Sequence, residues 1–105
     1  MCAVTVDGAP LRHVVRHSPT GFEWGYAGSG PADLALSILL DFTGDEDLAH
    51  RLHQDFKFAF VCRFPADKWT LAGADILTWL REHGAAPASL KWCDAAKTYT
   101  GARRP

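Results

Sequence analysis

A glycine-rich bend between an aromatic segment and an apolar one constrains the fold of this chain more than any other feature. It lies within residues 22–36, which read FEWGYAGSGPADLAL. The glycines permit backbone conformations that other residues avoid, and Pro31 suits the first turn of a helix. The sequence therefore predicts a strand over residues 22–26 that bends into a helix over residues 31–43.

The N-terminal segment predicts a β-hairpin that brings positive charge toward the bend. Two β-prone runs, residues 3–6 and 11–15, flank the sequence Asp7-Gly8-Ala9-Pro10. Asp-Gly between such runs favours a tight hairpin turn. Arg12 and Arg16 lie in the second arm or directly after it, so either arginine could supply positive charge to a ligand at the bend.

The remaining elements are predicted from residue spacing and helix-end signals. Asp45 can cap a second helix, expected over residues 45–54, whose first turn carries two acids. Phenylalanines alternate with other residues over 56–64, which favours a strand. The same residues also satisfy helical spacing, so a longer second helix stays open. Gly84 suits the end of a third helix over residues 72–83.

Together these elements predict one α+β domain over residues 1–84. A small antiparallel sheet, built from the hairpin and two further strands, would be covered on one face by three helices. The apolar residues within 85–105 show neither helical nor strand periodicity. Residues 85–105 are expected to form a C-terminal extension that packs on the domain or trails from it, with residues 102–105 frayed.

The composition excludes several classes of protein. Apolar residues make up 48% of the chain, but the longest apolar run is too short to cross a bilayer. The N-terminus lacks the pattern of an export signal, so a cytosolic location is the default. The net charge of -1 is a poor match for nucleic acid. Cys2, Cys62 and Cys93 are expected to be reduced thiols, without a disulfide or a thiolate metal site.

Charge is distributed unevenly along the chain. Between positions 33 and 55 there are six acidic residues and one basic residue, whereas five basic and two acidic residues lie between positions 81 and 105. These regions are either solvated faces or surfaces that meet each other or a partner.

The region around the bend also resembles a known signature. Residues 18–36, which read SPTGFEWGYAGSGPADLAL, resemble the domain-of-unknown-function family numbered 6166. The likeness continues through Phe56-Lys57, Phe60-Val61, Trp69, Leu71, Ile76 and Trp79-Leu80, and covers roughly residues 4–80. Members of this family are short bacterial and phage proteins without an established activity. The resemblance implies a small cytosolic protein that binds a host factor or a host signalling molecule.

The bend itself is the candidate ligand site. Backbone N–H groups at the start of the predicted helix favour an anion, and nearby aromatic rings could stack on a base. The bend lacks the lysine of a P-loop and does not match Gly-x-Gly-x-x-Gly, so a tight joint with a purely geometric role is the alternative. The residues assigned to a phosphorylated, nucleotide-type ligand are Trp24, Tyr26, Gly28, Ser29, Gly30, Asp33, Arg12 and Arg16.

The histidines do not complete a metal site. His50 and His53 are three residues apart on a predicted helix, and His13 and His17 are four apart. No His-Glu-x-x-His motif or cysteine cluster supplies further ligands, so no metal is predicted. No serine is accompanied by a recognisable base for nucleophilic catalysis.

The aromatic content predicts a second kind of site. Four tryptophans, six phenylalanines and two tyrosines are more than a small core encloses, and interface centres are enriched in Trp and Tyr. Folding of Trp92 back onto the domain is the alternative. The residues assigned to a protein interface are Trp92, Tyr99, Lys91 and Arg103.

The sequence thus predicts a small non-catalytic accessory protein, phage-like or from a mobile element, that counters a host process by binding. Its partner would be a nucleotide-type signal held at residues 28–33, or a host protein that it masks. A structural or protein-interaction module without a small ligand is the alternative, and an enzyme acting on a phosphorylated substrate ranks third. No cofactor is predicted, and a homo-oligomer stays open.

Overall fold

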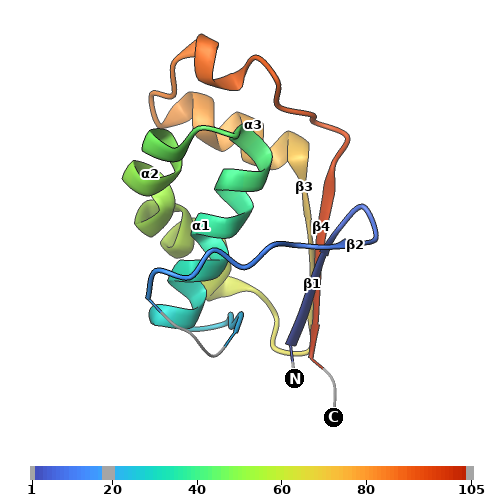
Figure 1. The fold of residues 1–105 in the computed structure, drawn as a ribbon. Helices are drawn as coiled ribbons and strands as arrows, with labels where there is room; N and C mark the ends of the chain where they lie inside the picture. The colour runs from blue at the N-terminus through green and yellow to red at the C-terminus, as the bar shows by residue number, and fades with distance from the viewer. Residues whose placement is uncertain (1, 18–20, 104–105) are drawn as a thin grey trace.

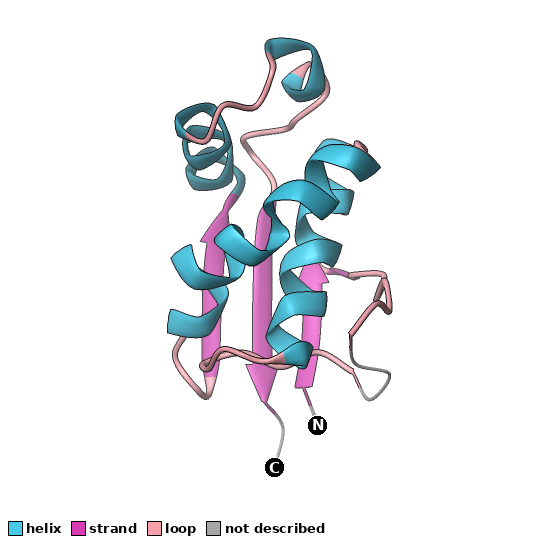
Figure 2. Ribbon diagram, turned by 90° about the vertical axis from the view of Figure 1, so that its left-hand side faces the viewer, coloured by secondary structure: helices cyan, strands magenta, loops and turns pink. Residues whose placement is uncertain are grey.

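The chain folds into a four-stranded antiparallel sheet with its long helices packed on one face (Figure 1). A computed structural model describes residues 2–17 and 21–103. Figure 2 looks onto the helices, with the strands behind them. The α+β class predicted from the sequence is confirmed. The elements are β1 (Cys2–Val6), β2 (Ala9–Pro10), α1 (Ser29–Thr43), α2 (Glu46–Ala59), a 3-10 turn (Val61–Arg63), β3 (Lys68–Ala72), α3 (Gly73–Glu82), a second 3-10 turn (Pro87–Leu90) and β4 (Thr98–Arg103).

The segment predicted to be an extension supplies a central strand. The strand order is β2-β1-β4-β3, so β4 pairs with β1 on one side and with β3 on the other. Gly101 of β4, for example, lies opposite Val4 and Trp69. The prediction of fraying is wrong for Ala102 and Arg103, because both are paired in the sheet. The rest of that prediction, residues 104–105, lies outside the described residues.

The predicted hairpin turn is confirmed, but its second arm is much shorter than expected. Asp7 and Gly8 both have positive φ angles, 49° and 86°, as a two-residue hairpin turn requires. The second arm ends at Pro10. Residues 11–17, here called the strap, leave the sheet and cross α1 (Figure 1). The strap does not form a strand because side chains of α1 bind its N–H groups.

The predicted strand over residues 22–26 is wrong. This segment is irregular, and its three aromatic side chains do not share a face: Trp24 is buried, whereas Tyr26 is 49% exposed. Gly25 has a φ of 85°, and its N–H donates to the carbonyl of Val61. The indole N–H of Trp24 donates to the carbonyl oxygens of residues 65 and 66. The segment is therefore held by the loop after α2 rather than by a neighbouring strand.

The predicted strand over residues 56–64 is also wrong, and the longer second helix is correct. Phe56 and Phe60 lie one helical turn apart with their rings tilted against each other, 4.9 Å between centroids, and both rings pack on Trp79 of α3. This packing selects helical spacing over alternation. The sheet instead gains β3, whose Trp69 and Leu71 are buried.

Helix α1 is the centre of the core, as the sequence predicted. It is buried along most of its length between the sheet, α2 and the strap. Gly44, with a φ of 66°, ends it, and the Asp45 carboxylate caps α2 by accepting a 3.1 Å hydrogen bond from the N–H of Leu48. In the described part of the chain, no helix has the length and apolarity needed to cross a bilayer.

Candidate functional site

The N-terminus of α1, the predicted ligand site, is closely covered by the chain that precedes it. A Cβ atom at Gly30 would lie 2.7 Å from the Cβ of Glu23, and one at Gly28 would lie 2.6 Å from the ring of Tyr26. Gly30 is therefore required by close packing against Glu23, whereas the half-exposed ring of Tyr26 could move aside for a side chain at position 28. Ser29 is exposed, and no side chain caps the helix. These contacts fit a tight joint, which was the alternative interpretation of the bend.

The other predicted ligand residues are not gathered at the bend. Trp24 is fully buried and offers no face to a ligand base, and Asp33 is fully buried as well. Arg12 and Arg16 are exposed on the strap. Arg12 lines a cavity beside the middle and end of α1, so the structure separates it from the glycines.

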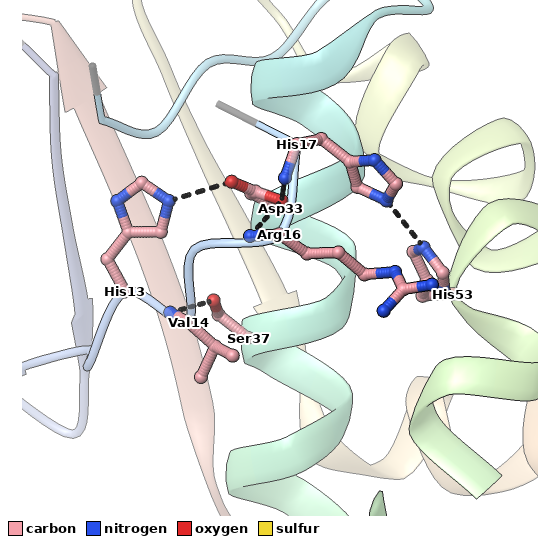
Figure 3. A network of polar contacts seen from close by, with 7 residues as sticks. All are labelled: His13, Val14, Arg16, His17, Asp33, Ser37 and His53. Atoms are coloured by element: carbon pink, nitrogen blue, oxygen red, sulfur yellow. Dashed lines mark hydrogen bonds and ion pairs between the residues drawn. The ribbon is translucent and has the colours of Figure 1, made fainter. Parts of the chain in front are cut away.

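Asp33 instead fastens the strap to α1 (Figure 3). Its Oδ1 accepts hydrogen bonds from the backbone N–H groups of Arg16 (3.2 Å) and His17 (2.8 Å). Its Oδ2 lies 3.1 Å from Nε2 of His13. One helical turn later, the hydroxyl of Ser37 accepts from the backbone N–H of residue 14 at 2.9 Å. Two polar residues four apart within the otherwise apolar stretch of residues 31–40 were the signal for this role.

Two histidines far apart in sequence meet at the end of the strap (Figure 3). The Nε2 atoms of His17 and His53 are 3.1 Å apart, and Nδ1 of His53 lies 2.7 Å from the carbonyl oxygen of His50. Burial of His53, followed by the nearby positive groups, lowers its pKa below the ordinary value. Among the described residues, no cluster of three or more His, Cys, Asp or Glu side chains is arranged to hold a metal ion.

A cavity of about 330 Å³ lies beside the strap. Its volume is near the lower end of the range for small-molecule sites, roughly 300–1,000 Å³. Its walls mix charged and apolar groups. The lining residues are Arg12, Val14, Ser37, Leu40, Asp41, Gly44 and Glu46.

The predicted protein interface is divided by the structure. Trp92 is 81% exposed, and the Lys91 Nζ lies 5.2 Å from the centre of its ring. Tyr99, predicted to be exposed with Trp92, is instead fully buried in β4. Arg103 forms a 3.0 Å ion pair with Glu23 near the other end of β4. Only Lys91 and Trp92 therefore remain together as an exposed group.

Lys91 and Trp92 belong to a segment, residues 84–97, that extends beyond the end of the sheet (Figures 1 and 2). We call it the protruding segment. Backbone hydrogen bonds hold its turns, including one from the Cys93 N–H to the Leu90 carbonyl. Lys97 Nζ anchors its end by a 3.1 Å ion pair with Asp41 of α1.

The comparison with known families agrees with the resemblance seen in the sequence. Residues 2–82 match the model of a family of unknown function, DUF6166. The chain belongs to the DUF6166 family. The matched residues include the strap, α1 and α2. The protruding segment and β4 lie C-terminal to the region that matches DUF6166. No curated protein and no solved structure matches the chain.

Proposed function

We propose that this chain is a small non-catalytic protein that acts by binding another protein through Lys91 and Trp92. The observation that carries the proposal is the 81% exposure of Trp92. Tryptophan is enriched among the residues that dominate binding energy at interfaces, and a ring left in water gains free energy when a partner covers it. The resemblance to short bacterial and phage proteins adds a context in which the partner is a host protein.

The shape of the protruding segment supports this proposal. Its turns are closed by backbone hydrogen bonds, and Lys97 anchors it to α1. A surface that is ordered before binding loses less conformational entropy when a partner docks. The segment therefore offers Trp92 as a preorganised anchor.

The chemistry of the pair defines the partner surface. The ring of Trp92 would enter an apolar pocket, and the ammonium group of Lys91 beside it favours a carboxylate at the rim of that pocket. We therefore propose a protein partner whose binding surface is an acid-rimmed apolar pocket.

The experiment is affinity capture from a bacterial lysate with the full chain as bait. The test variant is Trp92→Ala. Phe58→Ala is a matched control, because Phe58 is also an exposed aromatic residue, at 53%, with a lysine amine 4.4 Å from its ring. Once a captured protein has been identified, Trp92→Ala should weaken its binding by about 30-fold, the equivalent of about 2 kcal/mol. Phe58→Ala should leave the affinity unchanged.

Two outcomes would contradict the proposal. The first is recovery no better than background, or recovery that Trp92→Ala leaves unchanged. The second is thermal stabilisation by a nucleotide or cyclic nucleotide that is lost in Ser29→Trp but kept in Trp92→Ala. The second result would favour the nucleotide-type ligand at the bend instead.

A further inference from the structure

The strap is held by a few separate side-chain bonds. Ser37 and Asp33 of α1 bind its backbone N–H groups, and the ring of His17 bonds to His53 of α2. Bonds of this kind break one at a time, whereas a sheet ladder opens cooperatively. Within the described part of the chain, the contact between His17 and His53 is the side-chain hydrogen bond that ties the strap to α2, so the protonation state of the pair matters.

The hydrogen bond between the two rings requires one shared proton. Because the carbonyl oxygen of His50 can only accept, Nδ1 of His53 must carry a hydrogen. In neutral His53 the Nε2 atom is then an acceptor, and His17 Nε2 is the donor across 3.1 Å. The side-chain amide nitrogen of Gln54 lies 3.5 Å from the same Nε2 atom, which also suits an acceptor there. A second proton at this contact, on Nε2 of His53, would place two N–H groups against each other.

The charges around His53 oppose that second proton. Arg16 and His17 of the strap and His50 of α2 all disfavour a positive charge on His53. The carboxylate of Asp33 in α1 belongs to the same network, but it is engaged by backbone N–H groups of the strap. Burial adds to this effect, so the pKa of His53 lies below its ordinary value of 6.5.

We propose that the contact between His17 and His53 is a one-proton latch, which holds the strap on α2 at neutral pH and opens when Nε2 of His53 takes up that second proton. Between the lowered pKa of closed His53 and its ordinary value of 6.5, the open form binds more protons than the closed form. The latch is therefore at full strength above about pH 6.5 and weakens as the pH falls from there toward the lower pKa.

The test compares the wild-type chain with His17→Gln by hydrogen exchange. A glutamine can offer either its N–H₂ group or its carbonyl oxygen to His53, so it accommodates both protonation states. We measure the protection of the Arg16 amide, corrected for intrinsic exchange, from about pH 7.5 to about pH 5.5. Wild-type protection should fall severalfold below pH 6.5, up to the limit of about tenfold per pH unit for one proton, and His17→Gln should stay within about twofold. The control is His83→Gln, at the C-cap of α3, which should keep the wild-type profile.

Several outcomes would overturn the latch. One is an equal pH profile for wild type and His17→Gln. Another is protection of the pair by added Zn²⁺ at pH 7.5, lost in His17→Gln, which would make the pair a metal site. If His17→Gln does not fold, the ring ¹⁵N shifts of the wild-type chain decide, because the latch requires His53 to titrate below pH 6.5. Titration of His53 at its ordinary pKa would contradict it.

Discussion

Tyr99 and Asp41 are 58 positions apart in the sequence, yet the Tyr99 hydroxyl donates a 2.6 Å hydrogen bond to Asp41 Oδ2. The bond joins the central strand β4 to the last turns of α1, and Lys97 Nζ lies 3.1 Å from the same carboxylate oxygen. Burial, followed by Asp41, raises the pKa of Tyr99 well above its ordinary range. The hydroxyl therefore stays protonated and remains a donor.

Tyr99→Phe should destabilise the protein by about 2 kcal/mol. The substitution keeps the ring but removes a hydrogen bond to a charged group. Urea unfolding measures the loss. Tyr26→Phe is the matched control, because Tyr26 is 49% exposed, and its effect should be below about 0.5 kcal/mol. Equal stabilities for the two variants would show that the bond to Asp41 contributes nothing measurable.

Asp33→Ala should cost about 3 kcal/mol, because it removes the acceptor of two strap N–H groups and the partner of His13. Asp33→Asn should cost less, since its amide oxygen can still accept from the backbone. Chemical denaturation of both variants checks this order, with Asp67→Ala in an exposed loop as the control. A larger loss in Asp33→Asn than in Asp33→Ala would contradict the proposed anchoring role.

Gly101→Ala should destabilise the sheet by about 2 kcal/mol. The indole of Trp69 lies directly against Gly101 on the neighbouring strand, so an added Cβ would overlap the ring. Trp69→Leu should recover part of this loss, giving a coupling of about 1 kcal/mol in a double-mutant cycle. Thr100→Ala is the control within β4. Strictly additive effects of the two substitutions would exclude the predicted overlap.

A chain that ends at residue 96 should fail to unfold cooperatively. It lacks β4, the only described strand that pairs with both β1 and β3. Circular dichroism during heating measures cooperativity, and a synthetic peptide of residues 97–105 added in trans should restore a transition. A sharp transition of the truncated chain at the wild-type midpoint would contradict the central role of β4.

Local signals in the sequence predicted much of the fold. Pro31, Gly44 and Asp45 affect helix ends through their immediate neighbours, so the bounds of α1 and the start of α2 could be predicted from the sequence. Residues 56–64 were ambiguous because alternation and helical spacing coincide there, and contact with Trp79 of α3 decides for the helix. Such a contact depends on the whole fold.

The rest required information that no local pattern holds. β4 reads TYTGAR, with Tyr99 and Gly101 as its buried positions, and a glycine does not signal burial. The spacing of the histidines was visible in the sequence, but the meeting of His17 with His53 depends on the path of the strap over α1. Asp33 was assigned to a ligand, whereas in the structure its carboxylate holds the strap.

The place of β4 in the sheet also sets the order in which the protein can be completed during synthesis. β1 leaves the ribosome early and β3 follows, but the strand that fits between them is translated after both. Until then, the facing edges of β1 and β3 have no partner and are open to pairing with other chains. A nascent chain can form α1 and α2 before β4 is made, but it closes its sheet only once β4 has left the ribosome.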